Sequence, residues 1–273
     1  MPSTDLSVIV TSYKNPELLR LCLNSLKKHI AEGISHEIIV ADSATEEATE
    51  LLMREDFPGV AFLPFQENVG LARLLEKGLA VATGKYILYM NGDIVVTPGS
   101  VEGLLSYVKG HPDAGLVGPK LLNFNGTFQY SCFRFYRPVT ILYRRTLLNR
   151  LPFAKRHLDW FLMKEFDHKE VRDVDWIMGS VLMTSREAVN KVGSMDTAFF
   201  LYMEDVDWCR RFWEAGYRVV YYPHAEMFHY HGKGSAHGGF FRSLLFNRLT
   251  WYHIKSALRY FRKYLGKPVP EHQ

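Results

Sequence analysis

The sequence is poor in cysteine and has no long apolar run. Its three cysteines among 273 residues, Cys22, Cys132 and Cys209, are odd in number and widely spaced. This excludes a disulfide framework and a paired-cysteine metal site, and it favours a reducing compartment. No stretch reaches the roughly 20 apolar residues that span a bilayer, and the run from Leu6 to Val10 is too short for a secretory signal. We therefore expect a cytoplasmic protein.

Several signatures of common enzyme classes are also absent. No G-x-G-x-x-G follows the first β-rich run, Gly84-Lys85 lacks the spacing of a phosphate loop, and no G-x-S-x-G occurs. These absences argue against a dinucleotide-binding fold, an ATPase and a hydrolase with a nucleophile elbow.

Acidic residues are missing from two stretches that are rich in basic and aromatic side chains. The formal net charge is only +4, but residues 127–158 and 240–267 each carry seven Lys and Arg residues and no Asp or Glu. The second stretch predicts a long terminal helix over 240–265. Such a helix suits either an anionic membrane surface or packing against the domain with its basic residues exposed. No nucleic-acid partner is expected, because no recognisable binding motif accompanies the basic residues.

The first part of the sequence alternates between strand-like and helix-like spacing of apolar residues. Short β-rich runs, of the kind buried on both faces of a parallel sheet, occupy residues 6–11, 37–42, 60–63 and 86–90. Helical spacing lies between them, after Pro16, over 44–53 and after Gly70. This order predicts the α/β class, with a mostly parallel sheet flanked by helices and ligands at the carboxyl ends of the strands.

The second part of the chain is less regular. We expect strands over 115–121, 176–184 and 218–222, and helices over 185–192 and 205–215. The basic and aromatic composition of residues 123–173 indicates a surface insertion rather than sheet. The expected division is a domain over residues 1–238, with halves 1–110 and 111–238, followed by a helical tail over 239–273.

Two acids follow predicted strands. Asp93 comes after the run that ends at Met90, where its carboxylate could bind a divalent cation such as Mg²⁺ or Mn²⁺ together with phosphates and water. Asn91-Gly92-Asp93 is also a good turn sequence. Asp42 follows the second strand, where an acid commonly accepts hydrogen bonds from a ribose or base; capping the next helix is the alternative.

Further candidates lie in the second part. Glu204 and Asp205 head a predicted helix behind an aromatic run, where adjacent carboxylates can raise one another's pKa and act as a general base, or can simply complement the helix dipole. His229 and His231 stand at period two and could share one face of a strand, as zinc or phosphate contacts require; a structural role or a partnership with an acid is the alternative. No third ligand lies at tight spacing, so a zinc site has little support.

Taken in order, these segments resemble a known family. Val8 to Tyr13, Val40 to Ser43, Asn68 to Ala72, Asn91 to Asp93 and Phe200 to Asp207 with Gly216-Tyr217 and His229 resemble the family 2 glycosyltransferases of the GT-A fold, and most closely their bacterial rhamnosyltransferase-like branch. The resemblance covers about residues 5–235. It implies an inverting transfer of a sugar from a nucleotide diphosphate donor, such as dTDP-rhamnose or a UDP-sugar, to a hydroxyl of a glycan or lipid-linked acceptor in cell-surface polysaccharide synthesis.

The resemblance also implies roles for individual residues. Asp205, with Glu204, matches the catalytic acidic motif, and Asp93 with His229 matches the site for Mg²⁺ or Mn²⁺. The implied nucleotide-binding residues are Thr11, Ser12, Tyr13, Asp42, Asn68, Gly70, Arg73, Asn91 and Gly92. The implied donor or acceptor pocket comprises Trp176, Gly179, Ser180 and His231. Asn91 replaces the first acid of the family's D-x-D motif, which leaves fewer negative ligands for the cation.

Two other functions remain open on the sequence. A sugar nucleotidyltransferase would share the nucleotide-binding half, but it typically has a glycine-rich, basic loop where this chain has Thr11 to Pro16. A partner-binding protein could keep the fold without the chemistry, although the presence of Asp42, Asp93, Glu204, Asp205 and His229 argues against it. An acceptor carried on lipid would place the enzyme at the inner face of the cell membrane.

Overall fold

The computed structural model describes residues 4–230 and 248–270. The amino-terminal half alternates strands and helices as its periodicity predicts. Its elements are β1 (Leu6–Tyr13), α1 (Pro16–His29), β2 (His36–Ser43), α2 (Glu47–Glu55), β3 (Ala61–Phe65), α3 (Leu71–Val81), β4 (Tyr86–Asn91), β5 (Ile94–Val96) and α4 (Ser100–Gly110).

The remaining elements are shorter and more varied. They are β6 (Ala114–Leu122), β7 (Phe128–Gln129), β8 (Cys132–Phe133), α5 (Pro138–Arg145), the 3-10 helix η1 (Leu147–Arg150), α6 (Pro152–Phe161), β9 (Arg172–Asp173), β10 (Trp176–Ile177), β11 (Val181–Ser185), α7 (Arg186–Val192), α8 (Glu204–Glu214), β12 (Arg218–His229) and α10 (Arg248–Lys263).

The central sheet has the strand order β3-β2-β1-β4-β11-β6-β12-β5. Strands β3, β2, β1 and β4 are parallel, β12 is parallel to β6, and β11 runs antiparallel between β4 and β6. The predicted α/β class with a mostly parallel sheet is therefore confirmed. The parallel order brings the carboxyl ends of β1, β2 and β4 to one edge, because each connecting helix returns the chain to the opposite edge.

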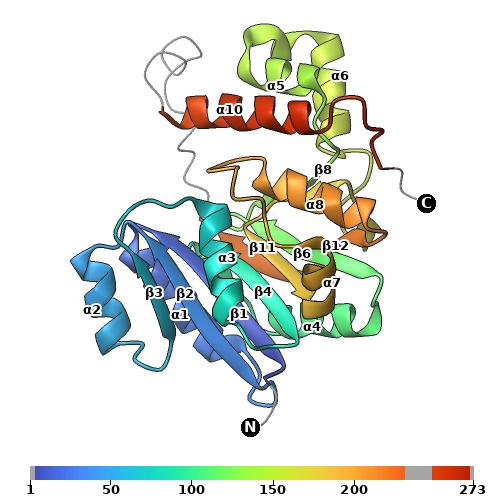
Figure 1. Ribbon diagram of the computed structural model, residues 1–273. Coiled ribbons are helices and arrows are strands. Elements are labelled where there is room, and N and C mark those ends of the chain that lie inside the picture. The colour runs from blue at the N-terminus through green and yellow to red at the C-terminus, as the bar shows by residue number, and fades with distance from the viewer. Residues whose placement is uncertain (1–3, 231–247, 271–273) are drawn as a thin grey trace.

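Helices cover both faces of this sheet (Figure 1). One apolar core joins α1, α2 and α4 to one face, through residues such as Leu23, Leu52 and Leu104. The other core joins α3, α7 and α8 to the opposite face, through residues such as Leu75 and Trp208. The strands are buried from both sides, which explains their continuous apolar runs.

Two predictions about the second part are wrong in detail. The expected strand over 176–184 is two strands, β10 and β11, because Met178 to Ser180 turn away from the ladder and Gly179 contacts the head of α8. The insertion over 123–173 contains the predicted surface segment α5 to α6, but it also contributes β7, β8 and β9, which pair with β6, β10 and β12.

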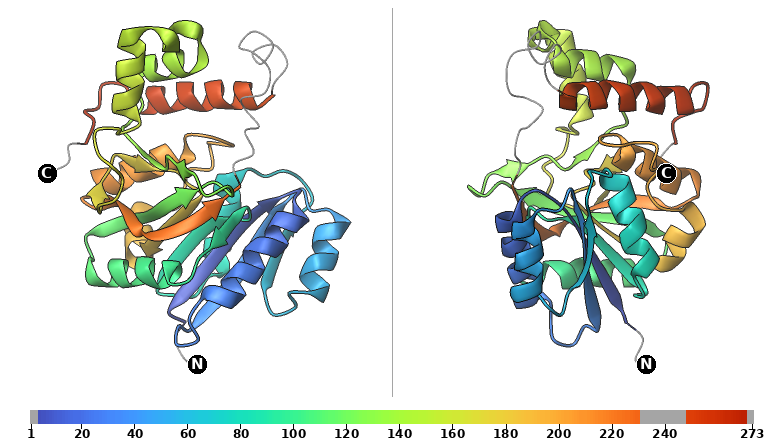
Figure 2. Two further views of the ribbon diagram at one scale, coloured as in Figure 1. Left: turned by 180° about the vertical axis from the view of Figure 1, so that it is seen from behind. Right: turned by 60° about the vertical axis from the view of Figure 1, so that its left-hand side comes forward.

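The carboxyl-terminal helix α10 packs against the domain. Its inner face buries Ala257, Tyr260 and Tyr264, and Lys263 pairs with Asp196 and Asp207. Figures 1 and 2 show α5, α6 and α10 together at the end of the molecule farthest from the amino terminus, with α8 between α10 and the sheet. Within residues 4–230 and 248–270, no helix is long and apolar enough to cross a membrane.

Candidate functional site

A polar network links the ends of β1 and β4. Thr11 and Asn91 are register partners, and the Thr11 hydroxyl donates to Asn91 Oδ1 at 3.1 Å. The Tyr89 phenol, two residues earlier on the same face of β4, donates to the same oxygen at 3.0 Å. The Gly92 amide donates to the Thr11 carbonyl at 2.8 Å. Two hydroxyls therefore fix the Asn91 carboxamide at the sheet edge.

Asp42 lies beside this network at the end of β2, in register with Ser12. Its side chain is fully buried, and neither carboxylate oxygen has a hydrogen-bond partner in the described chain. Burial raises the pKa of Asp42, and the Thr45 hydroxyl bonds to the Asp42 backbone carbonyl rather than to its carboxylate. Tyr13, the next residue of β1, is half exposed. This strand end therefore offers a buried acceptor beside an accessible aromatic ring.

The loop that leads into α3 lies against the segment that precedes Glu204 and Asp205. Asn68 Oδ1 accepts hydrogen bonds from the Ser43 hydroxyl and the Gly70 amide. Gly70 has a φ of +81°, and a Cβ there would lie 2.6 Å from the carbonyl oxygen of Phe200, so only glycine fits. Arg73 is exposed on the first turn of α3. The predicted nucleotide-binding loop thus lies at the same edge as the predicted acidic motif.

Asp93 and His229 are brought together by the pairing of β5 with β12. His229 is the register partner of Ile94, and the Tyr230 amide donates to the Asp93 carbonyl at 3.0 Å. His229 Nε2 lies 3.6 Å from Asp93 Oδ1, and its Nδ1 contacts the Gln129 carboxamide. A spacing of 3.6 Å exceeds a hydrogen bond and is slightly longer than the roughly 3 Å between adjacent ligands of an octahedral cation whose bonds are about 2.1 Å, so a small side-chain movement would let both groups bind one ion.

The acidic pair sits in the first turn of α8. Asp205 is part-buried, and its two oxygens accept hydrogen bonds from the amides of Gly179 (3.0 Å) and Val206 (2.9 Å). Burial raises the pKa of Asp205, although these amides lower it. Burial, and then repulsion from Asp205, raises the pKa of Glu204 well above its usual range. The two amides hold the Asp205 carboxylate in one orientation while leaving lone pairs that can accept a proton.

The backbone just before this pair is strained. Tyr202 and Met203 both have a φ of 69°, a region that residues other than glycine rarely adopt. Strain of this kind persists only where neighbouring contacts hold it. Here the Ser256 hydroxyl of α10 donates to the Leu201 carbonyl at 2.9 Å.

The segments that carry Asp93 and Asp205 lie close to each other. The Asn91 amide donates to the Ser180 carbonyl at 2.9 Å, one residue from the Gly179 amide that binds Asp205. Burial raises the pKa of the Tyr89 phenol well above its usual value. Three carboxylates add to that rise through their negative charge: Glu204, Asp205 and Asp93. Because Asp93 is two residues from Asn91 and Gly179 is one residue from Ser180, the hydrogen bond between Asn91 and Ser180 brings the segment of Asp93 close to the amide that binds Asp205.

Buried polar atoms without partners gather at this edge. Among the described residues, ten buried side-chain oxygen or nitrogen atoms have no hydrogen-bond partner. Five of them belong to Asp42, Asp93, Ser180 and Glu204. Such atoms are few in folded proteins and each costs free energy when left unpaired. Their concentration beside Thr11, Asn91 and Asp205 indicates the place where a polar ligand binds.

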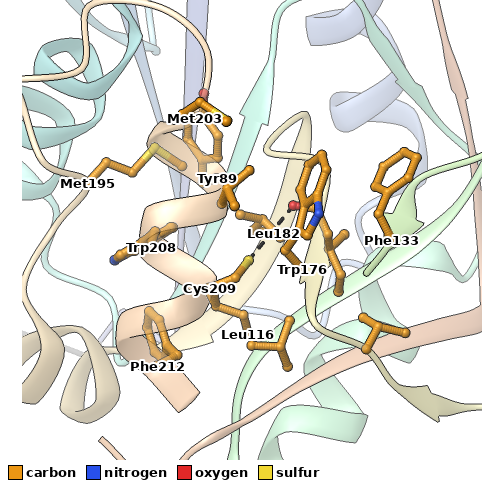
Figure 3. Packing of buried hydrophobic residues seen from close by; sticks show 14 of the residues in the cluster. Tyr89, Leu116, Phe133, Trp176, Leu182, Met195, Met203, Trp208, Cys209 and Phe212 are labelled. Atoms are coloured by element: carbon orange, nitrogen blue, oxygen red, sulfur yellow. Dashed lines mark hydrogen bonds between the residues drawn. The ribbon is translucent and has the colours of Figure 1, made fainter. Parts of the chain in front are cut away.

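Two residues of the predicted pocket stand apart. Trp176 is only 5% exposed, stacks on Phe133 with ring centroids 4.4 Å apart, and donates its indole N–H to the Arg134 carbonyl. Figure 3 shows it inside the apolar core rather than on an open wall, so the prediction of a pocket residue is corrected: its aromatic neighbours bury it. His231 lies outside the described residues. Gly179 and Ser180, by contrast, do border the acids.

Sequence reasoning missed two residues of this site. Tyr89 had a detectable signal, because it stands two positions before Asn91 in a strand and so shares its face. Gln129 had none, because its contact with His229 joins positions a hundred residues apart.

Replacing Gly179 by alanine should displace the Asp205 carboxylate. A Cβ at this position would lie 2.9 Å from the Asp205 Cβ, so the carboxylate must shift. We expect kcat to fall by about 10- to 100-fold, since misplacing a reacting group by about 1 Å costs roughly 100-fold. Gly59→Ala is the matched control, because nothing lies within 4 Å of a Cβ there. Equal rates for both variants would show that Gly179 does not position Asp205.

The raised pKa of Glu204 gives a stability prediction with a definite sign. The unfolded chain ionises Glu204 near its ordinary pKa, whereas the folded chain resists ionisation. Stability is therefore lost as pH rises above the unfolded value toward the folded one. Glu204→Gln removes this loss, so its unfolding free energy relative to wild type should increase between about pH 5 and about pH 8. Urea denaturation at both pH values measures it, and a constant difference would contradict the assignment.

Comparison with known proteins agrees with this geometry. The model of the family described as Glycosyl transferase family 2 matches residues 7–168, more than half of the chain. The match contains Thr11, Asp42 and Asp93; Asp205 and His229 lie beyond it.

Individual relatives span most of the chain. An N-acetylglucosaminyl-diphospho-decaprenol L-rhamnosyltransferase of Mycobacterium tuberculosis is 28% identical over 240 residues, covering 82% of this chain and 76% of that protein. Rhamnosyltransferase WbbL of Escherichia coli is 24% identical over 274 residues, covering 94% and 92%. An amylovoran biosynthesis glycosyltransferase, AmsE of Erwinia amylovora, is 23% identical over 262 residues, covering 94% and 84%.

A solved structure shares the fold. The crystal structure of GalNAc-T7 with UDP, GalNAc and Mn²⁺ matches with a TM-score of 0.62 at 14% identity. The match covers 83% of this chain and 43% of that one.

Proposed function

The chain belongs to glycosyl transferase family 2, and from that premise we propose that it transfers a sugar, with inversion, from a nucleotide diphosphate donor to a hydroxyl of a glycan or lipid-linked acceptor. It is a glycosyltransferase of polysaccharide or glycan synthesis. The observation that carries the finer proposal is the hydrogen bond from the Asn91 amide to the Ser180 carbonyl, which brings the segment of Asp93 beside the Gly179 amide that binds Asp205, next to buried polar atoms that lack partners.

We assign the proton transfer to Asp205. Its orientation is fixed by two amides, and burial raises its pKa toward the working range of a general base. The Asp205 carboxylate takes the proton of the acceptor hydroxyl while the acceptor oxygen bonds to the anomeric carbon. The bond from that carbon to the diphosphate breaks, and its electron pair leaves with the phosphate oxygen. Inversion requires the base and the diphosphate to lie on opposite sides of the sugar.

We assign the diphosphate side to Asp93, His229 and Asn91. Asp93 Oδ1 is buried without a hydrogen-bond partner in the described chain and lies 3.6 Å from His229 Nε2. That donor set fits Mg²⁺ or Mn²⁺, which take one or two protein ligands and complete their shell with phosphate and water. No group of three or more acidic, histidine or cysteine ligands occurs in the part of the chain that is described. The bound cation would neutralise charge on the leaving diphosphate.

We assign the nucleoside to the ends of β1 and β2. Asp42 supplies an unpartnered acceptor, Tyr13 supplies an exposed ring, and Asn68 and Gly70 shape the adjoining loop. Arg73 on the first turn of α3 would add positive charge near the donor. The two rhamnosyltransferase relatives favour dTDP-rhamnose as the donor, with UDP-sugars next.

The first experiment is a donor screen. Purified protein with Mg²⁺ or Mn²⁺ is incubated with a panel of nucleotide sugars, and released nucleoside diphosphate is measured. Release from dTDP-rhamnose above the other donors supports the proposal in full. A sugar nucleotidyltransferase would instead consume sugar phosphate and nucleoside triphosphate, and a partner-binding protein would release nothing and give no metal-linked heat with nucleoside diphosphates in calorimetry.

Asp42→Asn should lower the affinity for the donor and raise the free energy of unfolding. An uncharged amide is a weaker acceptor, so donor affinity should fall by about 10- to 100-fold, the equivalent of one charged hydrogen bond. The unfolding free energy at neutral pH should rise, because a buried unpartnered charge is removed. Calorimetry with nucleoside diphosphate and urea denaturation measure the two effects. Tighter binding in the variant would exclude Asp42 from the nucleoside site.

A further inference from the structure

Large exposed apolar side chains are concentrated at one end of the molecule. Among the described residues, fourteen large hydrophobic side chains are exposed, and nine of them lie within 139–153 or 251–269. The most prominent are Leu142 (48%), Leu147 (70%), Phe153 (59%), Trp251 (56%), Leu258 (67%) and Leu265 (84%). The first segment covers most of α5, all of η1 and the start of α6, and the second covers most of α10 and the residues just after it. These helices stand together in Figures 1 and 2. Exposed apolar side chains that gather in this way mark an interaction surface.

The charges around these side chains have one sign. On the outer face of α10, Lys255, Arg259 and Arg262 are exposed between the apolar positions, at the spacing of one helix face. Arg150 and Lys155 are exposed beside Leu147 and Phe153, and residues 127–158 contain no acid. The acid of α6, Asp159, is paired with Lys164 at 2.6 Å.

We propose that α5, η1, α6 and the outer face of α10 form one surface that binds an anionic lipid bilayer. Basic side chains attract the headgroups, and the exposed Leu, Phe and Trp side chains enter the boundary between headgroups and acyl chains. A protein partner is less favoured, because the cores of protein interfaces are depleted of charged residues, whereas here exposed basic side chains alternate with the exposed apolar ones.

The helix α10 also contacts residues 200–202, which lead to Glu204 and Asp205. Tyr252 stacks on Phe200 with ring centroids 4.8 Å apart, His253 lies 4.9 Å from the Tyr202 ring, and Ser256 binds the Leu201 carbonyl. The inner face of α10 thus supports the segment that leads to Asp205 while its outer face contacts lipid. The inference deepens the proposed function and rests on it in one respect: a lipid-linked acceptor would reach the base from this side.

Vesicle flotation tests the surface without catalysis. Wild-type protein should float with phosphatidylcholine vesicles that contain about one third phosphatidylglycerol, should not float with phosphatidylcholine alone, and should be released by high salt. Arg259→Glu with Arg262→Glu, and separately Leu147→Ser with Phe153→Ser, should each weaken the binding about tenfold or more. Matched controls on the opposite part of the molecule are Lys28→Glu with Arg54→Glu, and Leu21→Ser, which should bind as wild type does.

The outcomes separate this inference from the enzyme assignment. Diphosphate release from a free donor should be unchanged in the four surface variants, which also shows that they fold. The membrane proposal is refuted if the wild-type protein stays in solution with both kinds of vesicle. It is also refuted if all four variants bind the vesicles as the wild type does. If sedimentation then shows a self-association that only the α5–α6 and α10 variants lose, the surface is a protein interface. Flotation without any transferase activity would refute the proposed function alone.

Discussion

Asp205→Asn should lower kcat by about 10²- to 10⁴-fold, the usual contribution of a general base. The amide is nearly isosteric and can still accept the hydrogen bond from the Gly179 amide, although its NH2 group cannot accept the bond from the Val206 amide. It cannot take the proton of the acceptor hydroxyl. Single-turnover transfer with a saturating donor gives the rate, and calorimetry should show a donor affinity within about twofold of wild type.

Asp207→Asn is the matched control for this variant. Asp207 stands in the same turn of α8, but it is fully buried and bound to Arg211, Lys263 and Tyr264. Breaking a buried ion pair typically costs about 3 to 5 kcal/mol, so this variant should unfold more easily while its folded fraction keeps nearly normal kcat. If Asp205→Asn keeps wild-type turnover, the base must be reassigned.

Asp93→Ala should lower kcat by about 10²- to 10³-fold, the cost of losing one stabilising contact to the charge that develops on the leaving group. It should also remove Mn²⁺ binding, because only His229 would remain of the two proposed protein ligands. Electron paramagnetic resonance of Mn²⁺ with nucleoside diphosphate measures the binding independently of turnover.

Glu226→Gln is the control for the metal site. Glu226 lies on the same strand as His229, but it pairs with Lys120 at 2.6 Å. This variant should bind Mn²⁺ as wild type does. Retained Mn²⁺ binding in Asp93→Ala would place the cation elsewhere.

The first half of the site could be predicted from sequence because its signals are local. Asp42, Asn91 and Asp93 each follow an apolar run, and in a parallel sheet the ends of neighbouring strands meet at one edge. The same reasoning predicted that β1 to β4 are parallel. The substitution of Asn91 for an acid is also explained in place: the Thr11 and Tyr89 hydroxyls need an acceptor, which an amide oxygen supplies without negative charge.

The second half depends on contacts between distant segments. Asp205 could be identified as an acid at a helix start, but its fixed orientation comes from Gly179, twenty-six positions earlier. The break between β10 and β11 lets Gly179 make that contact. Because apolar residues stand on both sides of the break, the sequence does not indicate it. Trp176 was misjudged for a similar reason, since its burial comes from Phe133 and Tyr136 in the insertion. The domain boundary at residue 238 stays a prediction.

The role of the terminal segment could be only partly predicted. Its basic and aromatic composition was compatible with a membrane and with packing, and the structure shows that the two faces of α10 differ. Tyr260 and Tyr264 are buried against the domain, whereas Trp251 and Leu258 are exposed. Composition alone does not separate the faces until the neighbouring elements are known.

The proposed mechanism requires Asp93 and Asp205 to face the same bound donor. A crystal structure of Asp205→Asn with Mn²⁺ and the preferred nucleotide sugar tests this directly. We expect an anomalous Mn²⁺ peak beside Asp93 and His229, in contact with the diphosphate, and the sugar between that peak and the side chain at position 205. A cation bound away from Asp93, or a sugar that lies on a different face from residue 205, would contradict the account.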